Sequence, residues 1–185
     1  DATNTTFIPQ NFRFISKFLR VQGVTKVNGI LADLGVSSHQ FDEGERGFSI
    51  RFDGPLDMRM NAAQPVSAFD IINRYTEEQL QNIFSLYGEI RNAKQLAYAI
   101  SAARIQLRSE GGIKTTAQLR NIALSVVKGE KNPYLAQLFQ AVRIEVNDEM
   151  GALKELLNSA AQLLIPGGRL VVISYHSLED RMVKN

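Results

Sequence analysis

The sequence predicts an α/β protein in which one sheet domain is interrupted by an all-α segment. Two short apolar runs, VNGILADLG from Val27 and RLVVISYHS from Arg169, have the composition of buried strands. Between them, the segment from Val66 to Lys128 shows only the 3.6-residue period that is typical of helices. One sheet domain with a helical insertion explains this order most simply.

The first elements are predicted to be a short strand around Phe7 to Pro9, a helix, and the strand that ends at Asp33. The helix is predicted from apolar residues at helical spacing: Phe14, Phe18 and Val21. Gly23 is a suitable end for it. Because the run before Asp33 is almost continuously apolar, we expect this strand to be buried on both faces. Strand, helix and strand in succession predict a right-handed crossover in a parallel sheet.

Three capping boxes predict where helices of the insertion begin. They pair Ser67 with Asp70, Thr76 with Gln79, and Thr115 with Gln118. The apolar residues that follow recur at i, i+3, i+4 and i+7, as in Leu80, Ile83, Phe84 and Tyr87. These stripes are expected to form the core of a small helical bundle.

A long helix is predicted from Tyr134 to Leu164, ended by the Pro166-Gly167-Gly168 turn, and the second strand follows it. These elements divide the chain into three parts. Residues 1–44 are the first part of the sheet domain, residues 45–135 are the helical insertion with a hinge loop, and residues 136–185 are the second part of the sheet domain.

The composition excludes several classes of protein. Among 185 residues there is no cysteine, which excludes a disulfide framework and a thiolate metal site. The two histidines are too few for an imidazole-rich metal site, so no metal is expected. No apolar run is long enough to cross a bilayer, and a cytoplasmic location is expected. A net charge of +2 neither requires nor forbids a nucleic-acid partner.

Two of the predicted strands, those that begin at Val27 and Arg169, end in chemically useful residues. One delivers Asp33 and then LGVSSHQ, and the other delivers SYHSLED with His176. In an open parallel sheet, ligands bind beyond the carboxyl ends of the strands, so a site is expected there. Asp33 could instead cap a turn, and His176 could be a structural histidine. Neither a G-x-S-x-G motif nor a phosphate-binding loop is present.

The polar stretch after the first strand contains Arg46, Arg51 and Arg59. Asp53 and Asp57 lie between Arg51 and Arg59 in the sequence. Two interpretations are open, since the arginines either pair with these acids inside the loop or contact RNA phosphates.

Four long motifs resemble one known family. They are GILADLGVSSHQFDEGERGFSIRFDGPLDMRM, YGEIRNAKQLAYAI, FQAVRIEVNDEM and PGGRLVVISYHSLEDRMVK. Together they resemble the ribosomal RNA small subunit methyltransferase H family, also called MraW or RsmH. The resemblance implies a Rossmann-like class I methyltransferase that uses S-adenosylmethionine to methylate N4 of a cytidine in 16S ribosomal RNA. Its partner would be this RNA or the assembled small ribosomal subunit.

The resemblance also implies site residues. Phe12, Asp33 and Gln40 match cofactor contacts of the family. Asp33 is expected to orient the target amine, to bind cofactor, or both, and His176 is the second catalytic candidate, as proton acceptor or stacking surface. For RNA, the candidates are Arg46, Arg51, Arg59 and, near the end of the insertion, Arg143.

The departures from the family pattern concern the start of the chain. In the family, a glycine-rich cofactor loop and an acid that holds the ribose precede the part that Asp1 begins. Either the sequence is a trimmed portion of an enzyme or the cofactor loop is truly absent from the protein, and we expect this chain to be inactive alone. The competing hypothesis is a non-catalytic RNA-binding or scaffold module with a methyltransferase-like fold. The sequence does not indicate an oligomeric state.

Overall fold

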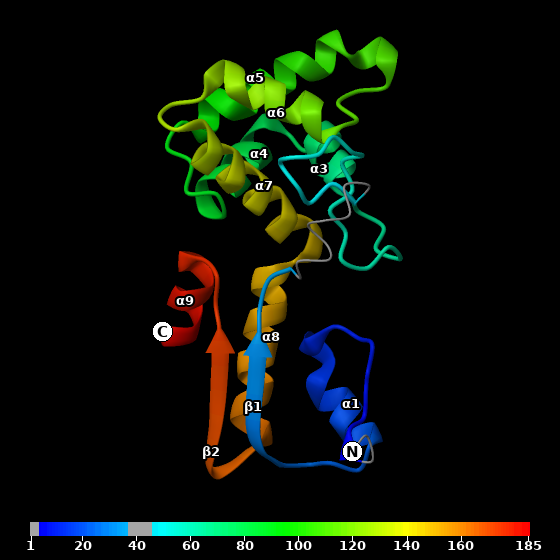
Figure 1. The fold of residues 1–185 in the computed structure, drawn as a ribbon, viewed down its shortest axis with the longest axis vertical. Coiled ribbons are helices and arrows are strands. Elements are labelled where there is room, and N and C mark those ends of the chain that lie inside the picture. Colours follow the sequence, from blue (N-terminus) through cyan, green and yellow to red (C-terminus); the bar gives the residue numbers. More distant parts are fainter. Residues whose placement is uncertain (1–3, 37–45) are drawn as a thin grey trace. The chain divides into compact units, whose positions relative to one another are not determined.

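A computed structural model describes residues 4–36 and 46–185, and the chain divides into two compact units (Figure 1). The first, which we call the sheet unit, comprises Asp1–Gly35 and Glu149–Asn185. The second, the helical unit, is Val36–Asp148. Of the boundaries expected from the sequence, residue 44 lies outside the described residues. The other, at residue 135, differs from the observed one because the helix around it packs on the helices of the helical unit.

The sheet unit contains two parallel strands, as predicted, so the mixed α/β class with a small parallel sheet is confirmed. Strand β1 (Val27–Asp33) pairs with β2 (Leu164–Ile173) up to the partners Asp33 and Ile173. Figure 1 shows the two strands side by side, with α8 (Glu149–Leu163) behind them. The 3₁₀ turn η2 (Phe12–Phe14) and α1 (Ile15–Val21) pack on α8, and α9 (Ser177–Lys184) follows β2.

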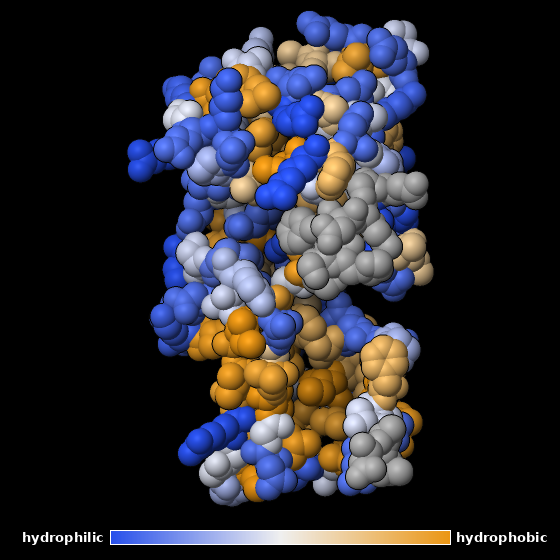
Figure 2. All heavy atoms as spheres, viewed as in Figure 1, coloured by the Kyte–Doolittle hydropathy of each residue, from blue (hydrophilic) through white to orange (hydrophobic). Residues whose placement is uncertain are grey.

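The expectation that β1 is buried on both faces is wrong for the described residues. Ile30 and Ala32 are buried and belong to apolar clusters with residues of α8. The next side chain, Leu31, is 70% exposed, and its neighbour Val171 on β2 is 51% exposed. Figure 2 shows the resulting apolar surface over the strands. Side chains alternate across a strand, and the helices among the described residues pack on the face that carries Ile30 and Ala32.

The predicted strand around Phe7 to Pro9 is absent from the structure of the described residues. Phe7 is 85% exposed, and the nearest backbone hydrogen bond is a turn from Gln10 N–H to Ile8 O. A strand needs a neighbour that satisfies its backbone groups, and this segment has none among the residues described. The crossover that joins the paired strands is therefore a longer one, which passes through the whole helical unit and α8.

The predicted long helix from Tyr134 to Leu164 is also wrong, because it is broken at Asp148. Helix α7 (Lys131–Asn147) ends there, since Asp148 adopts a left-handed conformation with φ of 47°. Helix α8 starts at Glu149. The Pro166-Gly167-Gly168 turn lies inside β2 as an irregularity, at the register shift between Val27 and Gly29.

The helical unit consists of packed helices, and all three predicted capping boxes are confirmed. Helices α3 (Ala68–Arg74), α4 (Glu77–Leu86) and α6 (Thr116–Val126) each begin with both hydrogen bonds of the motif. The remaining elements are α5 (Ala93–Gln106), the 3₁₀ turn η4 (Arg108–Glu110) and α7. The predicted stripe forms the core, with Leu80 and Phe84 fully buried.

Asn147 at the end of α7 holds the loop that precedes α3. Its side-chain oxygen accepts from Met60 N–H at 2.8 Å, and its amide nitrogen donates to Met58 O at 2.8 Å and to Arg143 O at 2.9 Å. Asn147 is 4% exposed, so these backbone groups have little access to water. The amide thus fixes Met58, itself a buried residue with positive φ, against α7.

Replacing Asn147 by Ala should therefore destabilise the helical unit by about 1–3 kcal/mol, because buried backbone groups lose their partners. Urea denaturation followed by helical circular dichroism measures this difference. Asn61→Ala is the matched control, since Asn61 is an exposed loop residue whose side chain accepts from Ala63 N–H. An equal loss in both variants would contradict the role assigned to Asn147.

Candidate functional site

Asp33 and Tyr175 meet at the carboxyl end of the sheet. Parallel pairing aligns Asp33 with Ile173, so the residues that follow β2 lie beside the end of β1. The Tyr175 hydroxyl donates to Asp33 Oδ1 at 2.9 Å, and this bond to a carboxylate raises the pKa of Tyr175. Both side chains are exposed. The site thus offers a carboxylate that is oriented by a neighbouring phenol.

Gly35 leaves the space in which the Tyr175 ring lies. A Cβ atom at position 35 would stand 3.4 Å from Cδ2 of Tyr175, and Gly35 has a φ of 83°. Any other residue would be strained there. The turn after Asp33 and the aromatic ring after β2 are therefore fitted to each other within the sheet unit.

A buried carboxylate supports the segment that carries Tyr175. Glu179, 2% exposed, accepts the Tyr175 N–H at Oε2 over 2.8 Å. Its other oxygen, Oε1, is 3.3 Å from His176 Nε2. Burial by itself would raise the pKa of Glu179, but the contacts with His176 and with the Tyr175 N–H outweigh it, so the pKa lies below its ordinary value.

The structure changes the expectation for His176. Its side chain is 9% exposed, so the ring offers no open face on which a base could stack. Its role as a proton acceptor stays a prediction. Tyr175, which the sequence analysis did not select, is instead the exposed aromatic residue at this strand end, with 67% exposure. The only signal for it was its place two residues after the strand.

The predicted cofactor contacts are only partly described. Phe12 lies in η2 and is 40% exposed, on elements that pack against α8. Asp33 is at the strand end, and Gln40 lies outside the described residues. Their roles toward S-adenosylmethionine therefore stay predictions.

Arg59 is engaged inside the helical unit. Its guanidinium donates to both oxygens of Asp57, each at 2.8 Å, and to the carbonyl oxygens of Ala62 and Gln64 at 2.9 and 2.8 Å. The hydrogen bonds from Arg59 lower the pKa of Asp57 despite its partial burial. These contacts favour the internal-pairing interpretation over RNA contact for Arg59.

Arg46 is held in a similar way. It donates to the carbonyl oxygens of Arg59 and Met60 at 2.7 and 3.1 Å, and its guanidinium lies 5.4 Å from the ring centre of Phe48. Asp53, the other acid of the loop, accepts from Ala117 N–H at 3.0 Å. This bond, at the start of α6, lowers the pKa of Asp53.

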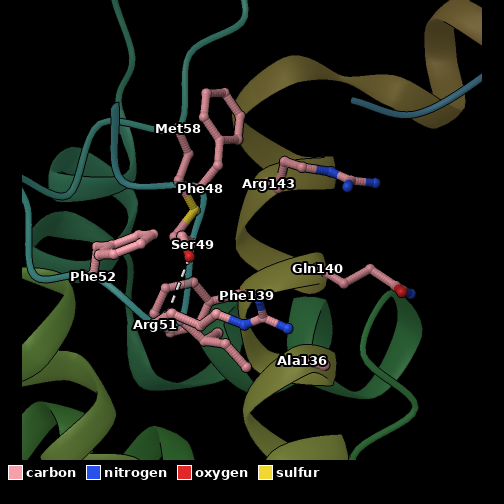
Figure 3. A pocket seen from close by; sticks show the side chains of 10 residues that line it. Phe48, Ser49, Arg51, Phe52, Met58, Ala136, Phe139, Gln140 and Arg143 are labelled. Carbon is pink, nitrogen blue, oxygen red and sulfur yellow. Dashed lines mark hydrogen bonds between the residues drawn. The ribbon is translucent and has the colours of Figure 1, made fainter. Parts of the chain in front are cut away.

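Arg51 and Arg143, by contrast, line a cavity of about 430 Å³ in the helical unit. Figure 3 shows the cavity between the loop after Arg46 and one side of α7. We call it the aromatic–arginine pocket and define it by Phe48, Phe52, Phe139, Arg51, Gln140 and Arg143. Phe52 is 53% exposed, and the Arg51 guanidinium makes no hydrogen bond or ion pair with the residues that the structure describes.

A second cavity of about 420 Å³ shares Ile50 and Arg51 with the aromatic–arginine pocket. Its lining adds Arg120 and Lys131, two basic residues that the sequence analysis did not select. They come from α6 and α7, far from Arg51 in the sequence, so only the packing of these helices brings them near it. The helical unit thus presents a basic surface with aromatic side chains.

Within the described part of the chain, no helix has the length and apolar character needed to cross a membrane.

Comparison with known proteins gives consistent matches. The family model described as the MraW methylase family matches residues 2–185. The chain is 55% identical over 183 residues to a protein of Cytophaga hutchinsonii named ribosomal RNA small subunit methyltransferase H, which covers 98% of this chain and 60% of the relative. Proteins with the same name from Bacteroides thetaiotaomicron and Amoebophilus asiaticus are 55% and 53% identical over 97% and 98% of this chain. The chain thus spans about 60% of the length of these relatives.

The Arg59–Asp57 pair generates a prediction about pH. Because the pKa of Asp57 is lowered in the folded state, its contribution to stability is present above the pKa of the unfolded state, about 3.9, and is lost as pH falls through the folded value. Asp57→Asn should therefore lower the urea midpoint at neutral pH, and the gap to the wild type should narrow below about pH 4.

The matched control is Arg51→Gln, which should change stability by less than about 0.5 kcal/mol at any pH, because the Arg51 side chain is exposed. A gap between wild type and Asp57→Asn that stays constant down to low pH would contradict the ion-pair explanation.

Proposed function

We propose a function for this chain, which belongs to the MraW methylase family. In the full-length protein, this chain takes part in the S-adenosylmethionine-dependent methylation of N4 of a cytidine in 16S ribosomal RNA. The sheet unit is then part of a Rossmann-like methyltransferase domain, and the helical unit is an insertion in that domain. The observation that carries the proposal is the Asp33 carboxylate at the carboxyl end of the paired strands, oriented by Tyr175.

The chemistry explains why a carboxylate is useful there. The exocyclic amine of cytosine is a weak nucleophile because its lone pair is delocalised into the ring. A carboxylate that accepts a hydrogen bond from the amine makes the lone pair more available and orients it for in-line attack. S-adenosylmethionine supplies the electrophilic methyl group. Asp33 is exposed and keeps Oδ2 free of the Tyr175 bond, so the carboxylate fits this role.

Tyr175 is proposed to position Asp33 and to present its ring to the target base. The Gly35 turn and the Glu179 carboxylate hold the ring and the backbone of Tyr175. An exposed aromatic ring next to a catalytic carboxylate is suited to stacking on an extruded nucleotide. His176 stays a candidate proton acceptor.

The aromatic–arginine pocket is proposed to contact the RNA substrate. Guanidinium groups suit phosphate and can stack on bases, and exposed phenylalanine rings accept unstacked bases of single-stranded RNA. Arg51, Arg143 and Phe52 combine these properties in one pocket. The partner is small-subunit ribosomal RNA or the assembled small subunit, which places the protein in the cytoplasm.

The second candidate function is RNA binding without catalysis. The observation that favours it is that the aromatic–arginine pocket and its basic neighbours lie within the helical unit, which has its own core. The two functions differ in what a change at Asp33 does, because only an enzyme needs that carboxylate.

In the full-length protein, Asp33→Asn should reduce methyl transfer by about 100-fold or more, because the neutral amide oxygen accepts the hydrogen bond of the amine much more weakly than a carboxylate does. Tyr175→Phe should reduce it by about tenfold through loss of one hydrogen bond to a charged group. Transfer of a labelled methyl group to small ribosomal subunits measures both effects.

Asp180→Asn is the matched control, since Asp180 is an acid of the same unit that pairs with Lys184 on the exposed side of α9. It should retain full activity. The melting temperatures of Asp33→Asn and Tyr175→Phe should equal that of the wild type, so that the loss of activity does not reflect unfolding. Normal methylation by Asp33→Asn would refute the role of Asp33, and RNA binding without any methylation by the wild type would favour the scaffold function.

RNA binding should depend on Arg51 and Phe52 of the full-length protein. Arg51→Gln should weaken binding and lower the slope of log affinity against log salt by about one, because one phosphate contact is lost. Phe52→Ala should cost about 1–3 kcal/mol of binding and leave the salt slope unchanged, because it removes stacking and no charge. Filter binding at several salt concentrations separates the two effects.

The control is Arg74→Gln, because Arg74 is an exposed arginine of α3 that pairs with Asp70 and lies outside the aromatic–arginine pocket. The RNA affinity of Arg74→Gln and its dependence on salt concentration should equal those of the wild type. If Arg51→Gln and Phe52→Ala both bind like the wild type, the RNA path avoids this pocket.

A further inference from the structure

Three potential metal ligands converge inside the sheet unit. Glu149 is the first residue of α8, His176 immediately precedes α9, and Glu179 lies in the first turn of α9. One ligand atom from each lies within 4.8 Å of the other two. The side chains of His176 and Glu179 are 9% and 2% exposed. We propose that Glu149, His176 and Glu179 bind a divalent metal ion.

The geometry of the group agrees with a metal site. Carboxylate oxygens and imidazole nitrogens lie about 2.0–2.2 Å from a bound zinc ion, so two ligands of one ion are about 3–4 Å apart. The distance between His176 Nε2 and Glu179 Oε1 is 3.3 Å. The ligand atom of Glu149 lies within 4.8 Å of the ligand atoms of His176 and Glu179. Because Glu149 is partly exposed, a small movement of its side chain would bring its carboxylate to coordination distance of the same ion.

The independent observation is the state of the His176 ring. Neither ring nitrogen makes a hydrogen bond with the residues that the structure describes, and the contact of Nε2 with Glu179 has ion-pair distance without hydrogen-bond geometry. The side chain does not cap α9 either. Helix N-termini favour the two carboxylates, but they give the imidazole no partner. A buried imidazole whose nitrogens make no hydrogen bond is costly, and coordination of a metal ion removes that cost.

The surroundings of Glu179 support coordination through one oxygen. Its Oε2 accepts the Tyr175 N–H, which leaves Oε1 directed to the His176 side. Hydrogen bonds of this kind orient the ligands of metal sites. One imidazole with two carboxylates suits Zn²⁺ or Mn²⁺, with water completing the coordination. The scarcity of histidine excludes only imidazole-rich sites, and this set needs one.

A bound ion would hold the segment that carries Tyr175. It would join the start of α8 to the start of α9, and Tyr175 lies next to His176 with its hydroxyl on Asp33. The proposal concerns binding alone and does not depend on methyl transfer.

The test is calorimetric titration of the full-length protein, stripped with a chelator, with Zn²⁺ and separately with Mn²⁺. We expect one saturable equivalent in the wild type. Glu179→Gln and Glu149→Gln should each weaken binding by more than about 100-fold, because removing a ligand costs at least as much as removing its hydrogen-bond partner. Circular dichroism checks that the variants are folded. If Glu179→Gln unfolds the protein because Glu179 is buried, the binding measured for Glu149→Gln decides the result.

One matched control makes the result specific. Asp180→Asn removes an acid that is next to Glu179 in the sequence and pairs with Lys184. This variant should bind the metal like the wild type. The proposal is overturned if neither metal binds at one saturable site, if Glu149→Gln binds like the wild type, or if Asp180→Asn loses the site.

Discussion

Parallel pairing of β1 with β2 is the constraint on which the rest of the sheet unit depends. Backbone N–H and C=O groups of a strand need partners, and here the partner of β1 comes after the entire helical unit and α8. Once Asp33 is aligned with Ile173, both strands deliver their next residues to one edge. The bond between Tyr175 and Asp33, which joins residues 142 positions apart, is a direct consequence of this register.

A second constraint is the break between Asn147 and Glu149. The Asn147 amide fixes the loop at Met58 and Met60 against α7, and this loop forms one wall of the aromatic–arginine pocket together with its neighbours. The left-handed Asp148 ends α7, so that Glu149 becomes the first residue of α8. The end of α7 therefore contributes to both proposed sites. Asn147 supports the RNA-contact surface that we propose in the helical unit, and Asp148 sets the start of α8, where Glu149 is a ligand of the metal site that we propose in the sheet unit.

The loop arginines show how identical side chains take different roles. Arg59 directs its guanidinium to Asp57 and two carbonyl oxygens, and Arg46 caps two further carbonyl oxygens. Because Asp53 is bound to the start of α6, it does not neutralise Arg51. The charge that remains for a ligand therefore lies at Arg51 beside Phe52. The interpretation of internal pairing therefore describes Arg46 and Arg59, and contact with RNA stays a proposal for Arg51.

The sequence by itself determined the local features: the capping boxes at Ser67, Thr76 and Thr115, the apolar stripe through Leu80 and Phe84, and the strand that ends at Asp33. These features depend on side chains that are a few residues apart, so they can be predicted from the local sequence pattern. Tertiary structure decided the one-sided burial of β1, the contact of Asn147 with the loop at Met58 and Met60, and the bond between Tyr175 and Asp33. Each of these features depends on residues that are far apart in the sequence and that only packing brings together. Contacts of this kind produce no periodic pattern in the sequence from which they could be predicted.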